Sequence, residues 1–311
     1  MIITDIDINS NINQKPICMT IGNFDGVHRG HQYIINELIN EAKKLNLETS
    51  VLSFFPHPRV YFNNDIENFN IITDSHKEAL FRNLNIDKYF RLKFDNSIAS
   101  MSANDFVNDL LIEKLKLKFL IIGENFKFGV NRTGNIDFLK KISIEKNFSL
   151  NVVNSIKSNE NDTIFSSSVI REKIKNGKFE DVKKYLGRHW SIKGKVQEGD
   201  KRARKMNFPT ANILSPNTIL PKKGVYVVRV IIDKVYYSGI ANFGRRPTFG
   251  GKKVLLEVHI FDFQKEIYGA ELTVEFINFI REEIKFDNLD QLKNQVETDK
   301  EKAKSFLKYN K

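Results

Sequence analysis

Ten residues between an apolar run and an amphipathic stretch read GNFDGVHRGH, from Gly22 to His31. Glycines let backbone amides approach phosphates closely, and the start of a helix adds the positive end of its dipole. The spacing of His28 and His31 places both imidazoles on one side of an entering helical turn. There they can donate hydrogen bonds to an α-phosphate during in-line displacement. The stretch therefore predicts a strand-to-helix junction that binds a nucleotide, with a pair of ordinary turn histidines as the plainer interpretation.

The sequence around this junction alternates short apolar runs with helical patterns, which is typical of parallel βαβ units. The predicted strands are 17–21, 49–55, 89–94, 119–122 and 149–153, and the predicted helices are 30–45, 75–84 and 103–115. Binding sites in doubly wound sheets lie at the carboxyl ends of the strands, where residues 22–31 and 123–134 fall. We therefore expect a Rossmann-like first domain, residues 1–186, with its site at that edge.

The second part of the chain has a different pattern. After a helical stretch over 169–186, strands joined by Gly- and Pro-containing turns are predicted at 192–196, 224–232, 235–241, 254–262 and 271–281. This spacing favours a closed antiparallel barrel. We expect a second domain, residues 187–311, that is a six-stranded β-barrel covered by a last helix over 289–307.

A second candidate site reads GDKRARKMNFPTAN, residues 199–212. Pro209 biases Phe208 toward extended geometry, and continued extension points Thr210 and Asn212 to one side. A hydroxyl and an amide carbonyl oxygen are suitable ligands for Mg²⁺, which takes its other ligands from water and substrate phosphates. Pro-Thr-Ala-Asn is also an ordinary turn sequence, so these residues alone leave both interpretations open.

Taken together, the motifs resemble the bacterial bifunctional riboflavin kinase/FAD synthetase family. In the first half, GNFDGVHRGH resembles the HxGH signature of nucleotidyltransferases, and three further family segments follow in order: FFPHP (54–58), GENFKFG (123–129) and SSSVIR (166–171). In the second half, PTAN (209–212) resembles the riboflavin kinase motif, and it is followed by GVY (224–226), NFGRRPTF (242–249), LEVHIFD (256–262), IYG (267–269) and FIREE (279–283).

The resemblance implies that the chain phosphorylates riboflavin to FMN and adenylylates FMN to FAD, using ATP and Mg²⁺. For the adenylylation site it implies catalytic roles for His28, His31, Asn125 and Arg171, the last as a contact to pyrophosphate. Nucleotide or flavin contacts are implied for Gly22, Phe24, Asp25, Gly26, Gly30, Phe126, Phe128, Ser166, Ser167 and Ser168. Taken singly, the serines are also explained as helix N-caps and the two later phenylalanines as core residues.

For the kinase site, the resemblance implies that Glu257 accepts the proton of the ribityl hydroxyl, while Thr210 and Asn212 hold Mg²⁺. The two-residue period of a strand places Glu257 and His259 on one face. Further nucleotide or flavin contacts are implied for Lys201, Arg202, Arg204, Gly224, Tyr226, Asn242, Phe243 and Arg281. Family members usually carry glycine where this chain has Ala203 and Asn207, which bears on loop geometry. We nevertheless expect kinase activity to be retained.

The charge of the chain suggests one alternative function, and the motifs argue against it and against a second. The net charge is +11, of which residues 188–311 carry +9, from 24 Lys and Arg against 15 Asp and Glu. A basic barrel that binds single-stranded nucleic acid through Tyr236, Phe243 and Phe249 is therefore one rival, and a nucleotidyltransferase for phosphopantetheine or nicotinate mononucleotide is another. The first leaves the paired histidines and Glu257 unexplained, and the second leaves the kinase motifs unexplained. We expect small-molecule substrates and no nucleic acid partner.

The remaining expectations concern location and assembly. No apolar stretch approaches the roughly 20 residues that span a bilayer. The first eleven residues are acidic and polar, unlike a secretory signal. The single cysteine, Cys18, has no intrachain partner and lies in an apolar run, so we expect a buried, inert thiol. We expect a cytoplasmic protein without membrane contact, and the oligomeric state stays open between a monomer and a weak homo-oligomer.

Overall fold

The computed structural model describes residues 1–311 except 64–65, 157–163, 198–208, 215–216, 249–250 and 310–311. The chain forms two compact units, Met1–Ser167 and Ser168–Lys311. Helices α7 (Ser167–Lys175) and α8 (Phe179–Leu186) thus belong almost entirely to the second unit. The sequence predicts the boundary between the two domains after Leu186, and that boundary stays a prediction.

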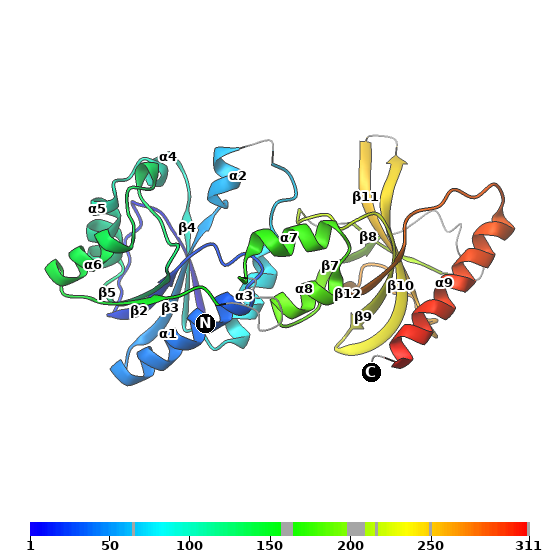
Figure 1. The fold of residues 1–311 in the computed structure, drawn as a ribbon, viewed down its shortest axis with the longest axis horizontal. Coiled ribbons are helices and arrows are strands. Elements are labelled where there is room, and N and C mark those ends of the chain that lie inside the picture. The colour runs from blue at the N-terminus through cyan, green and yellow to red at the C-terminus, as the bar shows by residue number, and fades with distance from the viewer. Residues whose placement is uncertain (64–65, 157–163, 198–208, 215–216, 249–250, 310–311) are drawn as a thin grey trace. The chain divides into compact units, whose positions relative to one another are not determined.

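The first unit is a parallel sheet with helices between its strands, as the sequence predicted (Figure 1). The strand order is β1-β4-β3-β2-β5-β6, and every neighbouring pair is parallel. The strands are β1 (Ile2–Ile6), β2 (Ile17–Ile21), β3 (Glu48–Phe55), β4 (Lys88–Lys93), β5 (Leu117–Gly123) and β6 (Ser149–Val153). The helices are α1 (Arg29–Leu45), α2 (Pro58–Phe62), α3 (Asp74–Asn83), α4 (Asn96–Ala99), α5 (Ala103–Asp105), the π-helix η1 (Phe106–Lys114), the 3₁₀ turn η2 (Val130–Arg132) and α6 (Ile136–Glu145).

The centre of this sheet positions the first candidate site. All five residues of β2 are buried, because β3 and β5 flank the strand and α1 packs against it. The chain leaves β2 through α1 to β3 on one side, whereas β5 lies on the other side. This change of direction opens a crevice at the carboxyl ends of β2 and β5, which is where ligands bind in such sheets. Cys18 lies within β2, and burial raises the pKa of its thiol to about 11, in agreement with the predicted inert thiol.

The second unit is a closed antiparallel barrel, as predicted, with strand order β10-β11-β8-β7-β12-β9. Its strands are β7 (Trp190–Gln197), β8 (Ala211–Leu214), β9 (Gly224–Ile232), β10 (Val235–Thr248), β11 (Gly251–Ile260) and β12 (Glu271–Arg281). Residue ranges for five of these six strands were predicted from the sequence, and β8, at the PTAN segment, is the remaining one. The long C-terminal helix α9 (Leu289–Tyr309) packs on β9, β10 and β12, so the predicted covering helix is confirmed (Figure 1).

Alternation along the strands divides the barrel's residues between its interior and the face under α9. Trp190, Tyr226 and Phe276 fill the interior, and Phe179 of α8 packs against all three rings. The outer face carries a separate apolar cluster that includes Val225, Val227, Ile240 and Ala303 of α9. Burial of apolar side chains therefore stabilises the barrel from its interior and attaches α9 to its outer surface.

An ion pair fastens α9 to the end of β12. The carboxylate of Asp299 is 1% exposed and accepts hydrogen bonds from Nε (3.0 Å) and Nη2 (2.6 Å) of Arg281, and from Gln295 (3.0 Å). Arg281 also donates from Nη1 to the carbonyl of Glu282 at 2.9 Å. A buried carboxylate is tolerated only with such partners, so the pair fixes the helix against the strand.

Replacing Gly224 with alanine should destabilise the barrel strongly. Gly224 has φ +144°, and a Cβ there would lie 2.2 Å from the carbonyl oxygen of Arg281 on the neighbouring strand. Because backbone would have to move, we expect Gly224→Ala to lower the free energy of unfolding by about 3 kcal/mol. The control is Gly269→Ala, where φ is +76° and a Cβ meets nothing within 4 Å; it should lose about 1 kcal/mol. Urea unfolding followed by fluorescence of Trp190, the single tryptophan, reports on this unit. Equal losses in the two variants would contradict the argument.

Candidate active sites

A cavity of about 350 Å³ lies at the carboxyl ends of β2, β5 and β6. It brings together residues that the sequence places more than a hundred positions apart. Of the residues predicted for the adenylylation site, those that line it are Gly22, Phe24, His28, Gly30, His31, Asn125, Phe126, Ser166 and Ser167. Three separate motifs therefore converge on one crevice, at the place where the sheet topology predicts a ligand.

The two histidines lie face to face at the start of α1. Their ring centroids are 3.6 Å apart and the rings are 18° from parallel. Nδ1 of His28, the N-cap of α1, accepts the backbone N–H of His31 at 3.3 Å. Because this Nδ1 accepts, a neutral His28 carries its proton on Nε2 and can donate it to a ligand. Burial, then the neighbouring His28 and Lys77, hold the pKa of His31 well below its ordinary value of 6.5.

Asp25 and Gly26 hold the loop and do not line the cavity. Asp25 is 3% exposed, and its two carboxylate oxygens accept the backbone N–H of Ile71 at 2.8 and 3.1 Å. Its carbonyl oxygen accepts the hydroxyl of Ser167 at 2.9 Å. Gly26 has φ +82°, a conformation that glycine adopts without strain. These residues shape the turn that presents the histidines, and their predicted ligand contacts stay a prediction.

Three other predicted residues also lie outside this cavity's lining. Phe128 is 6% exposed and packs in the core against Phe106, with Phe126 stacked on it at 5.4 Å. Ser168 and Arg171 follow on α7, in the second compact unit. Of the two phenylalanines in the segment 123–129, Phe126 therefore lines the cavity, whereas Phe128 packs against Phe126 in the core.

Sequence reasoning missed polar residues that line the same cavity. Thr20, on β2, is fully buried, and its hydroxyl has no hydrogen-bond partner among the described residues. Ser155 follows β6, accepts from the amide of Asn125 at 3.2 Å and donates its backbone N–H to Glu124 at 2.9 Å. Only the end of a predicted strand marked these positions, since neither has a motif of its own.

In the barrel, strand register gathers the second candidate site. Glu257 on β11 pairs with Asn212 on β8 and with Asn242 on β10, so the three side chains form one row across the strands. Residues directly opposite on antiparallel strands lie on the same face. The adjacent residues Leu256 and Val258 are fully buried in the interior. Alternation therefore turns Glu257 toward the outer face together with His259, in agreement with the prediction that the two residues share one face.

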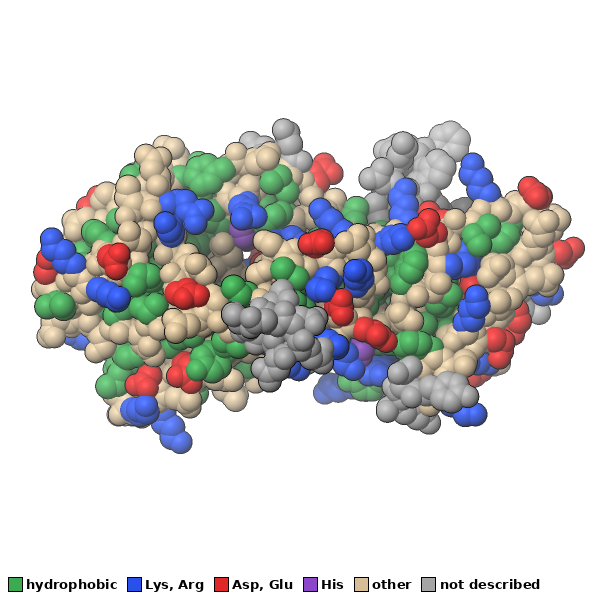
Figure 2. Space-filling view, viewed as in Figure 1, with side chains coloured by type: hydrophobic (Ala, Val, Ile, Leu, Met, Phe, Trp, Pro, Cys, Tyr) green, Lys and Arg blue, Asp and Glu red, His purple; other side chains and the backbone are tan. Residues whose placement is uncertain are grey.

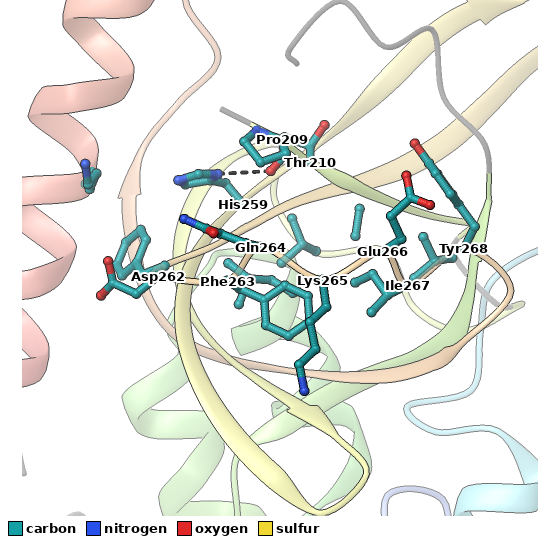
Figure 3. Close-up of a pocket in the computed structure, with 16 residues that line it drawn as sticks. Pro209, Thr210, His259, Asp262, Phe263, Gln264, Lys265, Glu266, Ile267 and Tyr268 are labelled. Carbon is teal, nitrogen blue, oxygen red and sulfur yellow. Dashed lines mark hydrogen bonds between the residues drawn. The ribbon is translucent and has the colours of Figure 1, made fainter. Parts of the chain in front are cut away.

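Two cavities adjoin each other at Thr210 and His259, beside this row. One of about 410 Å³ lies under α9 and is lined by Thr210, Asn242, Glu257, His259 and Arg281, and by apolar side chains that include Val225, Ile240, Ile284, Phe286 and Leu292. The other, of about 510 Å³, is lined by Pro209, Thr210, His259, Lys265, Glu266 and Tyr268 among others (Figure 3). Thr210 and His259 line both cavities. The candidate base thus belongs to a mostly apolar cavity that adjoins a more polar one.

Several residues predicted to contact ligands in the barrel have other positions. Tyr226 and Phe243 are buried in the interior, where the hydroxyl of Tyr226 donates to the carbonyl of Lys222. Gly224 is tight against Arg281 on the neighbouring strand. None of the three lines either barrel cavity described above. Lys201, Arg202 and Arg204 lie outside the described residues, as do Ala203 and Asn207.

The charge pattern bears on the nucleic-acid alternative. On the face shown in Figure 2, basic side chains of the second unit are interspersed with acidic ones. Basic residues of this unit form ion pairs, among them Lys193 with Glu271 and Lys222 with Glu282, both at 2.7 Å. Of the aromatics proposed as a platform, Phe243 is inside the barrel, Tyr236 is exposed, and Phe249 lies outside the described residues. The arrangement gives this rival no support.

Comparison with known proteins identifies a protein family for each half of the chain. Residues 10–169 match the family described as FAD synthetase, and residues 186–307 match the family described as Riboflavin kinase. The chain belongs to the bifunctional riboflavin kinase/FAD synthetase family. A Haemophilus influenzae protein named Bifunctional riboflavin kinase/FMN adenylyltransferase is 40% identical over 300 residues, which cover 96% of this chain and 97% of that protein. An Escherichia coli protein of the same name is 34% identical over 301 residues, with 96% of each chain covered.

A solved structure supports the fold across both units. A crystal structure from Streptococcus pneumoniae, named as a macrolide-efflux protein, matches with a TM-score of 0.88 and 28% sequence identity, and the match covers 98% of this chain and 99% of that one. In the part of this chain that the structure describes, no helix has the length and apolar character to cross a membrane. The likeness concerns the fold, and the family membership rests on the two matched domains.

The lowered pKa of His31 gives a test of this site. A lowered pKa means that the imidazole releases its proton at lower pH, so the ring should be uncharged at pH 6.5. The unfolded chain binds the proton first as pH falls, so stability should decrease with acidification below about pH 6.5. An NMR titration of the histidine rings measures this pKa directly. In His28→Ala, which removes the adjacent ring, the pKa of His31 should rise. A value at or above 6.5 in the unmodified protein would contradict the described burial.

Proposed function

We propose that the chain carries out two successive ATP-dependent reactions, which form FMN from riboflavin in the barrel and FAD from FMN in the parallel-sheet unit. The family membership of both halves supports the pair of activities. The observation that carries the assignment of sites is the row Asn212, Glu257 and Asn242, beside two cavities that share Thr210. A candidate base, candidate metal ligands and two substrate-sized spaces then adjoin one another.

In the kinase reaction, riboflavin occupies the cavity under α9. Its walls are mostly apolar, which suits an aromatic ring system, and a few polar groups orient the ligand. ATP occupies the adjoining cavity, where Lys265 and Lys300 can approach its phosphates. The ribityl hydroxyl then attacks the γ-phosphorus while Glu257 accepts its proton, and ADP leaves. Thr210 lines both cavities, so it lies at the boundary where the phosphoryl group is transferred from ATP to riboflavin.

The donor set at Thr210 and Asn212 fits Mg²⁺ bound together with ATP. Asn212 is 8% exposed, and its Oδ1 accepts no hydrogen bond from the described residues, so a buried acceptor lacks a partner. Across the described parts of the chain, no three His, Cys, Asp or Glu side chains gather as a metal site. A cation here would therefore take neutral oxygens from the protein and the remainder from phosphates and water. It would supply neutralisation of the charge that develops during transfer.

In the adenylylation reaction, an FMN phosphate oxygen attacks the α-phosphorus of ATP, and pyrophosphate leaves. His28 donates from Nε2 to the oxygens of the α-phosphate, and the N-terminus of α1 adds its dipole. Asn125 positions the nucleotide, while Ser166 and Ser167 contact the leaving pyrophosphate. His31 stays neutral beside His28, so the pair avoids two adjacent positive charges. Since both reactions consume ATP, we propose the cytoplasm as the compartment.

Single substitutions should separate the two activities. Purified protein with riboflavin, ATP and Mg²⁺ should form FMN and FAD, resolved by chromatography. His28→Ala removes the proposed donor and should stop the sequence at FMN, with a loss of adenylylation of about 100-fold. Glu257→Gln removes the proposed base and should abolish FMN formation while FMN supplied directly is still adenylylated. The reverse pattern would show that the sites are assigned to the wrong units.

Thr210→Val should weaken the use of Mg²⁺ by the kinase alone. Valine keeps the shape of threonine and removes the hydroxyl ligand, so half-maximal FMN formation should require about tenfold more Mg²⁺. The Mg²⁺ dependence of FMN adenylylation should not change. The control is Thr218→Val, because Thr218 is a buried threonine of the same unit that lines neither cavity. An unchanged Mg²⁺ dependence in Thr210→Val would remove Thr210 from the proposed ligands.

A further inference from the structure

His259 lies where the two barrel cavities meet. It lines both of them together with Thr210, and it is two residues from Glu257 on the same strand face. If the kinase function proposed above holds, the phosphoryl group is transferred from one cavity to the other beside His259 and Thr210. The position of Thr210 against β11 then decides whether the attacking hydroxyl, the phosphate and the cation are in line.

Thr210 lies just outside the ladder of backbone hydrogen bonds that pairs β8 with β11. The pairing of β8 with β11 ends at Ala211 opposite Val258. Thr210 and Pro209 follow beyond that last pair, and proline has no N–H with which to continue a ladder. At this position the imidazole Nδ1 of His259 lies 3.0 Å from the carbonyl oxygen of Pro209 (Figure 3). A side chain therefore makes the contact that the next backbone pair would have made.

The chemistry of this contact fixes the state of the ring. A carbonyl oxygen only accepts, so Nδ1 of His259 carries the hydrogen. Burial lowers the pKa of His259, while the Pro209 carbonyl, Glu297 and Asp262 raise it and Lys300 lowers it. The edge of the Phe261 ring, with centroids 5.9 Å apart, packs beside the imidazole. The ring is thus held in one orientation on a rigid strand.

We propose that His259 is a positioning residue of the kinase site, whose Nδ1–H holds Pro209 and Thr210 against β11 in place of the next backbone rung. The residue does not exchange a proton with substrate in this arrangement. Its contribution is to keep the Thr210 hydroxyl at the wall shared by the two cavities. Small displacements at a reacting centre reduce rates strongly, by about 100-fold for 1 Å.

The test compares two amides at position 259. The Nδ2 of asparagine is as many bonds from Cα as Nδ1 of histidine, whereas the Nε2 of glutamine corresponds to the other ring nitrogen. We expect His259→Asn to keep kcat/KM for FMN formation within about fivefold, and His259→Gln and His259→Ala to lose about 100-fold. The two impaired variants should also need more Mg²⁺ for half-maximal kinase activity. FMN adenylylation should be unchanged in all three.

The outcomes separate this inference from the function on which it rests. An unmodified protein that forms no FMN would overturn the proposed kinase function itself. With an active protein, equal activities of His259→Asn and His259→Gln would overturn the positioning role, whether both are active or both impaired. An unaltered Mg²⁺ requirement in His259→Gln would overturn it as well. The Asn and Gln pair decides the question even where His259→Ala fails to fold.

Discussion

The antiparallel ladder through β10, β11 and β8 is the constraint on which the barrel site depends. Side chains on a strand alternate between two faces, so burying Leu256 and Val258 in the interior directs Glu257 to the outer face. Backbone pairing then sets Asn212 and Asn242 on either side of it. These three side chains are therefore positioned by the same hydrogen bonds that close the barrel, and a shift of β11 by one residue in register would turn Glu257 inward.

The parallel-sheet unit reaches a comparable result through its loop. Phe24, Gly26 and Val27 all have positive φ in the turn that follows β2, a conformation that a non-glycine residue adopts only when its surroundings hold it. Phe24 and Val27 are buried, and Asp25 fastens the turn through its bonds to Ile71 and Ser167. Buried packing thus offsets the strain, and the turn delivers two stacked histidines to the start of a helix.

Sequence patterns predicted both architectures and the convergence of the main motifs, because apolar runs and turn residues report burial directly. They did not reveal β1, whose sequence mixes polar and apolar residues and buries only Ile6. Tyr226 and Phe243 lie within family motifs, yet alternation faces them into the barrel, which only the register shows. The partner of Arg281 is Asp299 on a separate helix, and no local pattern announces such a long-range pair.

Family members usually carry glycine where this chain has Ala203 and Asn207, two residues that lie outside the described part of the structure. Both belong to the segment before Pro209, which precedes the first paired residue of β8. Asn212 and Glu257 lie within the ladder, and His259 contacts Pro209 directly, so contacts among the described residues position the candidate base and the candidate ligands. The segment that holds these two positions and the strands β8 and β11 are therefore separate parts of the chain, and the strands place the candidate base and Asn212. This division explains how a chain that departs from its family in the loop can still retain the chemistry of the barrel.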